Sequence, residues 1–523
     1  MKRSKILTET VNMSSELLSS VPTQLFINNQ YVDSTSSDRL SLVNPYDGSP
    51  IPHAAHIASK EDVDTAVAAA TAAFKTTWGS TAPSERAKCM LRFADLVEKN
   101  ADRLAALESL PTGKPVSPTK GFELAHMVEV YRYYAGWADK LSGESYPESN
   151  GTYKIVRHEP LGVCAGIGSW NATFMYLGWK VAPALAAGNC FIYKPSEKSP
   201  FGALALGELY AQAGFPAGTV QILNGASETG AALAGHLGIR KISFTGSIGG
   251  GRAVQDAATR SNLKKVTLEL GGKSPAIVFG DVDFERAVGG VCGFLFNSGQ
   301  VCVATSRVLV QKSIAEKFTE ALKTAFAATE ASLGSDPLDP ATSFGPIVDK
   351  LQFDKIMSYI EIGKKTATLV TGGGQKGTSG FFIKPTIFLN PDPESPIVRE
   401  EIFGPVMCIQ TFETEEEAIR LANGSEYGLA ASIYTSNIDR ALRVSSQLEC
   451  GGVAVNSPFM PEVNTAFGGI KASGQGRELG KYALLEYTEP KSVHIKYVSM
   501  PCSTVRRWGM LMPRCRLDFG SKL

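Results

Sequence analysis

Two stretches early in the chain place apolar residues at helical spacing. The first is Ala-rich and covers Glu61–Trp78, and the second begins at Ser84. In both, the apolar positions fall on one side of a helix of 3.6 residues per turn. The pattern therefore predicts two amphipathic helices ahead of the main body of the chain.

From about residue 161, short apolar runs alternate with helical stretches. Strands are predicted at Leu161–Ala165, Cys190–Tyr193, Val220–Leu223, Lys241–Phe244 and Lys265–Leu268. Helices are predicted between them at Val181–Ala187, Ala203–Ala213 and Ala231–Leu237. Strands that alternate with helices of this length indicate a parallel sheet with helices on both faces.

The alternation begins again after Gly272. Strands are predicted at Ala276–Phe279, Arg307–Gln311, Val406–Phe412, Leu429–Tyr434 and Gly452–Val455. Helices are predicted near Phe284–Phe296, Ile314–Ala327, Glu415–Leu421 and Ile438–Gln447, and loops at Gly372–Gly380 and Pro391–Pro396. The predicted fold class is therefore α/β, with two doubly wound parallel-sheet domains.

Composition excludes several classes of protein. The 523 residues are 43% hydrophobic and 20% charged, which is typical of a globular protein. Lys+Arg 52 against Asp+Glu 51 gives a net charge of +1, so we expect no broad nucleic-acid footprint. No run of about 18 apolar residues occurs, so no membrane span is expected.

Cysteine and histidine usage argues against disulfides and metal. Nine Cys occur without a CxxC pair, and six His occur without an HExxH pattern. A secreted disulfide framework would be denser, and a catalytic metal would need clustered ligands. We therefore expect reduced thiols in an intracellular protein and no bound metal.

The two ends of the chain are treated as separate segments. Residues 1–22 are polar with no apolar core, which predicts a flexible leader and not a secretory signal. The chain ends in Ser521, Lys522 and Leu523, the tripeptide that the peroxisomal import receptor reads. We expect peroxisomal import, with a chance match and a cytoplasmic location as the alternative.

Two segments have the character of ligand-binding loops. Glycines in Phe244–Gly251 follow a strand and open a helix, where backbone N–H groups could approach a pyrophosphate. A flexible turn is the alternative, since the spacing is not GxGxxG. Lys194–Glu197 ends a strand, where Glu197 could bind a ribose hydroxyl and repel a 2′-phosphate. On spacing alone, a solvated surface ion pair is the favoured interpretation of that segment.

Three further segments carry groups suited to catalysis. Glu269 ends an apolar strand, so burial would raise its pKa and make it a candidate general base. Cys302 follows a Gly-Gln turn, which suits a presented nucleophile more than a core residue. Asn171 follows a strand and could donate to an oxyanion. Each also has an ordinary structural explanation when taken alone.

The order of these segments resembles the aldehyde dehydrogenase superfamily. The motifs are Asn171, Lys194–Glu197, Gly246–Gly251, the LELGGK segment with Glu269, the GQxC segment with Cys302, Glu401–Pro405 and Phe467–Gly469. The resemblance extends from about Thr23 to Tyr497.

This resemblance implies an NAD-dependent oxidation of an aldehyde to a carboxylic acid. Cys302 would attack the carbonyl to give a thiohemiacetal and then a thioester. The Asn171 amide and the Cys302 backbone N–H would stabilise the oxyanion, and Glu269 would activate the water that hydrolyses the thioester. Lys180 and Glu478 would support a proton relay.

The resemblance also assigns a cofactor site for NAD. Its residues would be Trp170, Lys194, Ser196, Glu197, Gly230, Gly246, Ser247, Gly251, Glu401 and Phe403. Lys194 and Glu197 would hold the adenosine ribose, and Gly246, Ser247 and Gly251 would face the pyrophosphate. Glu401 and Phe403 would position the nicotinamide ribose and ring.

The implied organisation has an NAD-binding domain over 23–271, interrupted by an oligomerisation arm at 142–159. A catalytic domain would cover 272–474, with a return helix and an oligomerisation strand at 475–499 and a tail at 500–523. The arm near Ser142–Glu159 would pair with Lys491–Tyr497, an alternating segment typical of an edge strand. A homodimer or homotetramer is expected.

The implied substrate tunnel departs from the family pattern after Asn171. Ala172 and Thr173 stand where an aromatic residue and a proline are frequent, so a wider tunnel and a bulky or long aldehyde are expected. The tunnel residues would be Ala172, Tyr176, Trp179, Val301, Val303, Phe459 and Phe467. Binding of a quaternary ammonium by Tyr176 and Trp179 is an alternative, and a generic apolar tunnel is favoured.

The leading prediction is thus an NAD-dependent aldehyde dehydrogenase of the general class. A Cys-dependent esterase is a second hypothesis, since Cys302 and Glu269 could also hydrolyse activated esters without NAD. A catalytically idle structural protein is a third, and the presence of Cys302, Glu269 and Asn171 argues against it.

Overall fold

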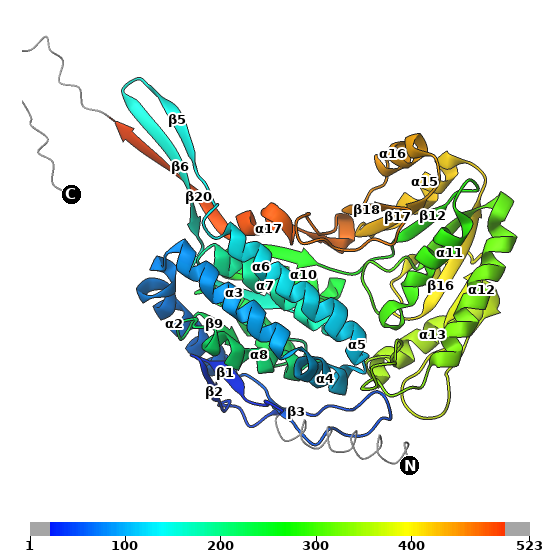
Figure 1. The fold of residues 1–523 in the computed structure, drawn as a ribbon, viewed down its shortest axis with the longest axis horizontal. Coiled ribbons are helices and arrows are strands. Elements are labelled where there is room, and N and C mark those ends of the chain that lie inside the picture. The colour runs from blue at the N-terminus through cyan, green and yellow to red at the C-terminus, as the bar shows by residue number, and fades with distance from the viewer. Residues whose placement is uncertain (1–20, 497–523) are drawn as a thin grey trace, which may run out of the picture. The chain divides into compact units, whose positions relative to one another are not determined.

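The computed structural model describes residues 21–496 of the chain, and its elements are labelled in Figure 1. The predicted leader at 1–22, except residues 21 and 22, and the targeting tripeptide lie outside the described residues. Within the described part, residues 21–141 and 160–489 form one compact unit, and residues 142–159 and 490–496 form a second.

The first sheet has eight strands in the order β19-β11-β10-β7-β8-β9-β1-β2. The strands are β1 (Leu25–Ile27), β2 (Gln30–Val32), β7 (Val163–Ile167), β8 (Cys190–Lys194), β9 (Val220–Ile222), β10 (Lys241–Thr245), β11 (Lys265–Glu269) and β19 (Gly474–Gln475). The central strands β11, β10, β7, β8 and β9 are parallel, and antiparallel strands close both edges. The five strands predicted from alternation are confirmed, with ends that differ by at most two residues.

Helices cover both faces of this sheet. They are α2 (Lys60–Thr76), α3 (Pro83–Lys99), α6 (Ala125–Trp137), α7 (Thr173–Ala186), α8 (Pro200–Gln212), α9 (Ser227–Gly235) and α10 (Ile248–Ser261). Both α2 and α7 contact β7 and β8, whose residues are all buried. Because strands buried on both faces show no polar alternation, the short apolar runs in the sequence identified them.

The helix predicted at Val181–Ala187 is too short. The observed α7 begins eight residues earlier, at Thr173, and all of its residues are buried. A helix without a polar face has no amphipathic period, so the pattern could not show where it begins. The unit also contains β3 (Arg39–Leu40), β4 (Ala55–His56), η1 (Trp78–Ser80), α4 (Ala101–Thr112), α5 (Val116–Pro118), η2 (Thr119–Leu124), η3 (Trp170–Ala172), η6 (Lys471–Ser473) and α17 (Gly480–Glu486).

The connectivity of the first sheet creates a topological switch point. The chain runs outward from β7 through β8 to β9, then crosses back and adds β10 and β11 on the other side of β7. The loops after β7 and β10 therefore diverge above the carboxyl ends of two neighbouring strands. Open α/β sheets bind their ligands at such a point.

The second sheet has seven strands in the order β14-β15-β16-β13-β12-β17-β18. They are β12 (Pro275–Val278), β13 (Arg307–Gln311), β14 (Thr368–Thr371), β15 (Thr386–Leu389), β16 (Val406–Phe412), β17 (Ala430–Tyr434) and β18 (Gly452–Val455). Val308 and Val310 belong to one apolar cluster, and Leu309 between them belongs to another. This alternation shows that the sheet is packed on both faces.

The helices around the second sheet differ from the predicted ones in two places. They are α11 (Phe284–Cys292), η4 (Gly293–Gly299), η5 (Lys312–Ile314), α12 (Ala315–Ser332), α13 (Lys350–Thr366), α14 (Pro396–Arg399), α15 (Glu415–Asn423) and α16 (Ile438–Ser445). The α-helix predicted near Phe284–Phe296 ends at Cys292 and continues as the 3-10 turn η4, until the backbone turns to non-helical angles at Phe296, Asn297 and Ser298. The helix α13 was not predicted, although Asp349 caps its first turn.

The second unit contains a three-stranded sheet in the order β20-β6-β5. Its strands are β5 (Glu144–Ser149), β6 (Thr152–Pro160) and β20 (Thr488–Lys496). The predicted pairing of the 142–159 segment with the C-terminal edge strand is thus confirmed for the described residues. A salt bridge between Lys491 and Glu159 joins β20 and β6.

Among residues 21–496, no helix combines the length and the hydropathy that a bilayer crossing would require.

Candidate active site

A cavity of about 470 Å³ opens at the switch point of the first sheet. Its wall includes Gly168–Trp170 after β7 and Thr245–Ser247 after β10. The predicted residues Trp170, Lys194, Ser196, Glu197, Gly230, Gly246 and Ser247 all line it. The structure therefore brings together most of the residues that the sequence assigned to NAD.

Lys194 and Glu197 are not a solvated surface pair. Lys194 is buried, and its Nζ donates to the Pro195 carbonyl at 3.0 Å and lies 3.9 Å from a Glu197 carboxylate oxygen. Burial lowers the pKa of Lys194. Because both groups border the cavity while only Glu197 is well exposed, a ligand-binding role fits them better than a surface ion pair.

The glycine-rich segment forms the predicted strand-to-helix turn. Ser247 caps α10, and its Oγ accepts from the Gly250 backbone N–H at 3.2 Å. A Cβ at Gly246 would lie 2.6 Å from the Phe244 ring, so no side chain fits there without moving that ring. Gly251 is the exception among the predicted residues of this turn: it is buried against Leu270 and does not line the cavity. Glycine at position 251 allows α10 to pack closely against the Leu270 side chain.

A second cavity of about 150 Å³ adjoins the first and shares five lining residues with it. The shared residues are Ser169, Trp170, Thr245, Gly246 and Ser247. This second cavity is also lined by Asn171, Tyr176, Cys302, Glu401 and Phe403. The glycine-rich turn therefore borders both cavities, and Cys302 borders the second.

The loop that carries Cys302 is held in an unusual backbone conformation. Asn297, Ser298 and Gly299 have φ of 48°, 54° and 72°, so three successive residues are left-handed. A Cβ at Gly299 would lie 2.4 Å from the Gly404 carbonyl oxygen, which is why glycine is required there. Gln300 anchors the loop, since its Oε1 accepts from the Val348 backbone N–H at 3.0 Å.

Cys302 lies beside two polar groups. Its Sγ is 3.8 Å from the Tyr176 hydroxyl, which also accepts from Asn171 Nδ2 at 3.3 Å. The Asn171 amide makes a second bond, to the Gln300 carbonyl, at 3.2 Å. Cys302 is half-buried, and desolvation raises the pKa of its thiol to about 12, with Glu401 and Glu269 adding to the rise. The thiol is therefore protonated at neutral pH.

Glu269 ends β11 as a buried carboxyl group. Neither of its carboxylate oxygens has a hydrogen-bond partner, and the residue is 3% exposed. Burial, followed by the nearby Glu478 carboxylate, raises the pKa of Glu269 well above its ordinary value. The raised pKa expected from the sequence is thus present, and the carboxyl group is free to exchange a proton.

Lys180 and Glu478 form a buried ion pair next to Glu269. Lys180 Nζ lies 2.5 Å from Glu478 Oε1 and donates to Ser243 Oγ at 3.0 Å and Thr245 Oγ1 at 2.8 Å. Thr245 is the neighbour of Glu269 in the pairing of β10 with β11. Chains of hydroxyl and charged groups of this kind can move protons, as the resemblance implied.

Glu401 and Phe403 occupy the far wall of the second cavity. Glu401 Oε1 accepts from the Gly272 backbone N–H at 3.0 Å, and burial raises the pKa of Glu401 to about 7. Gln352 and Lys355 are among the lining residues of this cavity that were not predicted. Both lie on α13, and the Asp349 cap with the helical spacing of Phe353, Ile356 and Ile360 was the signal that could have found them.

The aromatic residues predicted for the tunnel form a continuous cluster. Ring centroids lie 5.5 Å apart for Tyr176 and Trp179, 4.8 Å for Trp179 and Phe467, and 6.3 Å for Phe459 and Phe467. Ala172, Val303 and Phe459 are half-buried against the core, and Val301 is half-buried as well. His126 next to this cluster was not predicted. Its ring centroid lies 5.9 Å from that of Trp179, and its Nε2 has no hydrogen-bond partner.

The cavities fit a dinucleotide better than a metal ion. No group of three or more His, Cys, Asp or Glu side chains that could hold a metal occurs between residues 21 and 496. The larger cavity combines a helix N-terminus, glycines that a Cβ would disturb and a buried lysine, all of which suit a phosphate-bearing ligand.

Comparisons with known proteins agree with this site. The chain matches the family model "Aldehyde dehydrogenase family" over residues 31–493. An aldehyde dehydrogenase of Emericella nidulans is 46% identical, over 91% of this chain and 95% of its own length. Human retinal dehydrogenase 2 is 44% identical, over 91% of this chain and 92% of its length.

Among solved structures, an indole-3-acetaldehyde dehydrogenase of P. syringae superposes with a TM-score of 0.88. It is 37% identical, with 92% of this chain and 99% of that chain covered, and it is a cysteine-to-alanine mutant in complex with NAD+ and IAA. The chain therefore belongs to the aldehyde dehydrogenase family, and its reaction is the NAD-dependent oxidation of aldehydes to carboxylic acids.

Proposed function

We propose that Cys302 is the nucleophile of this reaction and that Glu269 is the general base. The Cys302 sulfur would attack the aldehyde carbonyl carbon and form a thiohemiacetal. Because the pKa of the thiol is about 12, the proton must leave through a nearby acceptor, and Glu269 is close enough to influence that pKa. The raised pKa of Glu269 makes it a base matched to this task.

Asn171 would stabilise the oxyanion that this attack produces. Its Nδ2 donates to the Tyr176 hydroxyl, which is itself beside the Cys302 sulfur. An amide donor aimed at the carbonyl oxygen favours the tetrahedral state over the planar aldehyde. The Cys302 backbone N–H would provide the second donor.

NAD would be held by Lys194 and Glu197 at its ribose, by Gly246 and Ser247 at its pyrophosphate, and by Glu401 and Phe403 at its nicotinamide half. When bound, NAD supplies the hydride acceptor. Glu197 at the rim of the cavity favours a free ribose hydroxyl over a 2′-phosphate.

Glu269 would complete the reaction by removing a proton from the water that hydrolyses the thioester. Both of its carboxylate oxygens lack protein partners, so a water molecule can bind there. The pair of Lys180 with Glu478 would pass that proton on through Ser243 and Thr245.

The proposed role of Cys302 rests mainly on its position relative to the two cavities and to Asn171. Cys302 lines a cavity that shares five lining residues with the switch-point cavity, and the Tyr176 hydroxyl contacts both the Asn171 amide and the Cys302 sulfur. The test is Cys302→Ala, which we expect to abolish NADH formation while NAD still quenches protein fluorescence. Cys292→Ala, which changes another half-buried cysteine, should remain active. NADH formation at a normal rate by Cys302→Ala would contradict the proposal.

We further propose that the substrate is an apolar aldehyde with a ring or a long chain. Tyr176, Trp179 and Phe467 form a buried apolar cluster that extends to the half-buried ring of Phe459, and the half-buried Ala172 has a small side chain. Two similar proteins are named for ring-bearing aldehydes, retinal and indole-3-acetaldehyde. A general aldehyde dehydrogenase with a broad apolar range remains the class that we propose.

The substrate proposal can be tested with aldehydes of increasing bulk. Ala172→Phe should lower kcat/KM for ring-bearing and long aldehydes by about 10-fold or more, and leave a two- or three-carbon aldehyde within about 2-fold. Equal losses for small and bulky aldehydes would show that position 172 does not border the substrate.

A homo-oligomer and a peroxisomal location are also proposed. Every side chain of β5 is exposed, and so are most of those on β20, which leaves strand surface free for a second copy of the chain.

The proposed peroxisomal location is supported by the C-terminal tripeptide Ser521–Leu523. Its removal should leave the protein in the cytosol, and continued import without it would contradict the proposal.

A further inference from the structure

A buried charge cluster lies behind the residues that face the substrate. Lys114 Nζ is 3.0 Å from Glu108 Oε1 and 2.7 Å from Glu123 Oε1, and all three side chains are at most 6% exposed. Burying three charged groups is costly unless they are paired and hydrogen-bonded. The proposed chemistry uses none of the three, so their retention in the interior requires another explanation.

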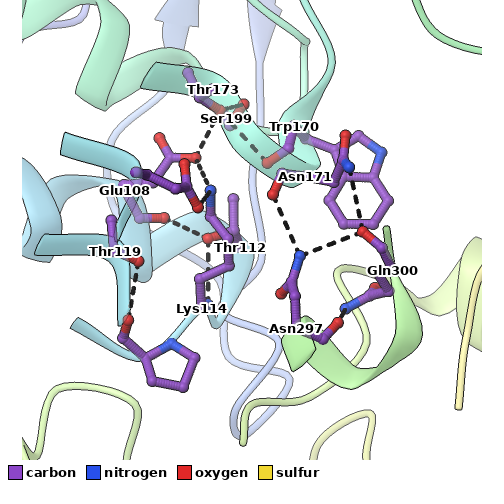
Figure 2. A network of polar contacts seen from close by, with 12 residues as sticks. Glu108, Thr112, Lys114, Thr119, Trp170, Asn171, Thr173, Ser199, Asn297 and Gln300 are labelled. Atoms are coloured by element: carbon purple, nitrogen blue, oxygen red, sulfur yellow. Dashed lines mark hydrogen bonds and ion pairs between the residues drawn. The ribbon is translucent and has the colours of Figure 1, made fainter. Parts of the chain in front are cut away.

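The cluster is tied directly to the first residue of α7. Thr173 Oγ1 donates to Glu108 Oε1 at 2.6 Å, and the same hydroxyl lies 2.8 Å from Ser199 Oγ. Figure 2 shows these contacts on one side of the segment Trp170–Thr173. A bond from a hydroxyl to a charged carboxylate is short and stronger than a neutral one, so it can fix the start of the helix.

Asn171 lies two residues before Thr173 and is held from the opposite side. Asn297 Nδ2 donates to the Asn171 carbonyl at 3.2 Å, and Asn171 Nδ2 donates to the Gln300 carbonyl at 3.2 Å. In Figure 2 the two groups of contacts meet at the turn Trp170–Thr173. The turn that carries the proposed oxyanion donor is therefore anchored at both ends.

We propose that Thr173, held by Glu108 and Lys114, is a positioning residue that sets the direction of the Asn171 amide. This inference rests on the proposed role of Asn171 in stabilising the oxyanion. Lys114 holds Glu108 in place, Glu108 holds the Thr173 hydroxyl, and Thr173 fixes where the chain turns from η3 into α7. The buried charges thus stabilise an active-site backbone in a region that side-chain packing alone would hold less tightly.

Glu108 is also restrained on its other sides. Its backbone carbonyl accepts from Thr112 Oγ1 at 2.5 Å, and a Cβ at Gly202 would lie 2.8 Å from Glu108 Oε2. The carboxylate therefore has little room to move. A rigid carboxylate is what a positioning role requires, because displacements of about 1 Å at an active site can cost on the order of 100-fold in rate.

The test is a double-mutant cycle that joins Thr173 to Asn171. Thr173→Val removes the hydroxyl at nearly constant shape, and Thr173→Ser retains it. We expect Thr173→Val to lower the rate of the first NADH turnover about 10- to 100-fold, and Thr173→Ser to stay within about 3-fold of the wild type. In an Asn171→Ala background, Thr173→Val should change that rate by less than about 2-fold.

A matched control separates positioning from simple loss of stability. Thr386→Val removes a buried hydroxyl on β15 of the second sheet, where Thr386 Oγ1 donates to the Lys384 carbonyl, and should leave the rate within about 2-fold. If Thr173→Val does not fold, Glu108→Gln replaces it in the double-mutant cycle with Asn171→Ala. It should lower the rate several-fold with Asn171 present and have no effect without it.

Two results would overturn the inference. One is an equal loss of rate for Thr173→Val with and without the Asn171 amide, and the other is Thr173→Ser as slow as Thr173→Val. A different result would reject the underlying role instead: if Asn171→Ala alone keeps the wild-type rate, then Asn171 is not the oxyanion donor.

Discussion

Burial raises the pKa values of individual residues at this site. The same desolvation raises the pKa of Cys302 to about 12 and lifts the pKa of Glu269 well above its ordinary value. A carboxyl group with a raised pKa can accept a proton at neutral pH, which an ordinary exposed glutamate does poorly. Burial therefore gives Glu269 the property that deacylation needs.

The kinetic role of Glu269 is tested by Glu269→Gln. We expect one NADH to form per site in a first burst, followed by steady turnover reduced about 100-fold or more, because hydrolysis of the thioester loses its base. Stopped-flow absorbance separates the two phases. In the wild type, steady turnover should fall as pH drops through the pKa of Glu269, and the variant should lack that fall. A variant that turned over steadily at the wild-type rate would exclude Glu269 as the base.

The same carboxyl group predicts how stability changes with pH. Since the pKa of Glu269 is higher in the folded than in the unfolded chain, folding favours its protonated form. Its contribution is complete below the unfolded pKa near 4.5 and is lost as pH rises toward the folded pKa, at about 1.4 kcal/mol per pH unit. Urea unfolding at several pH values should show Glu269→Gln gaining stability relative to the wild type as pH increases. A difference that does not vary with pH would contradict this.

At the scale of elements, tight turns bring the reacting groups to their positions. The left-handed run Asn297–Gly299 presents Cys302, and the turn from β10 to α10 presents backbone N–H groups to the larger cavity. In both turns, a glycine stands where a Cβ would meet neighbouring atoms. These turns are therefore sensitive to changes that an ordinary surface turn would tolerate.

Two glycines of the same turn give a matched pair. A Cβ at Gly246 would lie 2.6 Å from the Phe244 ring, whereas a Cβ at Gly249 meets no atom within 4 Å and faces solvent. Gly246→Ala should weaken NAD binding about 10-fold or more by moving that ring in the cavity. Gly249→Ala should bind NAD within about 2-fold of the wild type without loss of stability. Titration of protein fluorescence with NAD measures both. Equal affinities would show that the Phe244 ring has room to yield.

At the scale of the whole molecule, the site needs both sheets of the larger unit. Asn171 follows β7 and Glu269 ends β11 of the first sheet, while Cys302 precedes β13 and Glu401 precedes β16 of the second. Residues that are 230 positions apart in the sequence, such as Asn171 and Glu401, line one cavity. The site can therefore form only when the two sheets have packed together.

The proposed assembly is also a property of the whole molecule. Ile495 on β20 is 45% exposed on a strand with few buried residues. Ile495→Asp should lower the oligomeric state measured by sedimentation velocity, because a charge would replace apolar surface. Leu237→Asp, at an exposed residue outside the small three-stranded sheet, should leave assembly unchanged. Retention of the full oligomer by Ile495→Asp would place the interface elsewhere.

The sequence alone predicted the parallel sheets and the reaction class. Short apolar runs identified β7 to β11, because strands buried on both faces are apolar throughout, and the order of motifs led to the roles proposed for Cys302, Glu269 and Asn171. Local patterns could not locate the start of α7, since a fully buried helix has no polar face. The family resemblance assigned Gly251 to the cofactor, although packing against Leu270 accounts for its small size.

Only the tertiary structure determined which side chains are buried and which of them are hydrogen-bonded to one another. Spacing alone favoured a solvated pair at Lys194 and Glu197, whereas burial of Lys194 depends on elements distant in the sequence. The bond from Thr173 to Glu108 joins residues 65 positions apart, and no periodicity reports such a contact. Burial and hydrogen bonding between distant segments are set by packing, so the pKa of Glu269 and the anchoring of Asn171 follow from the fold.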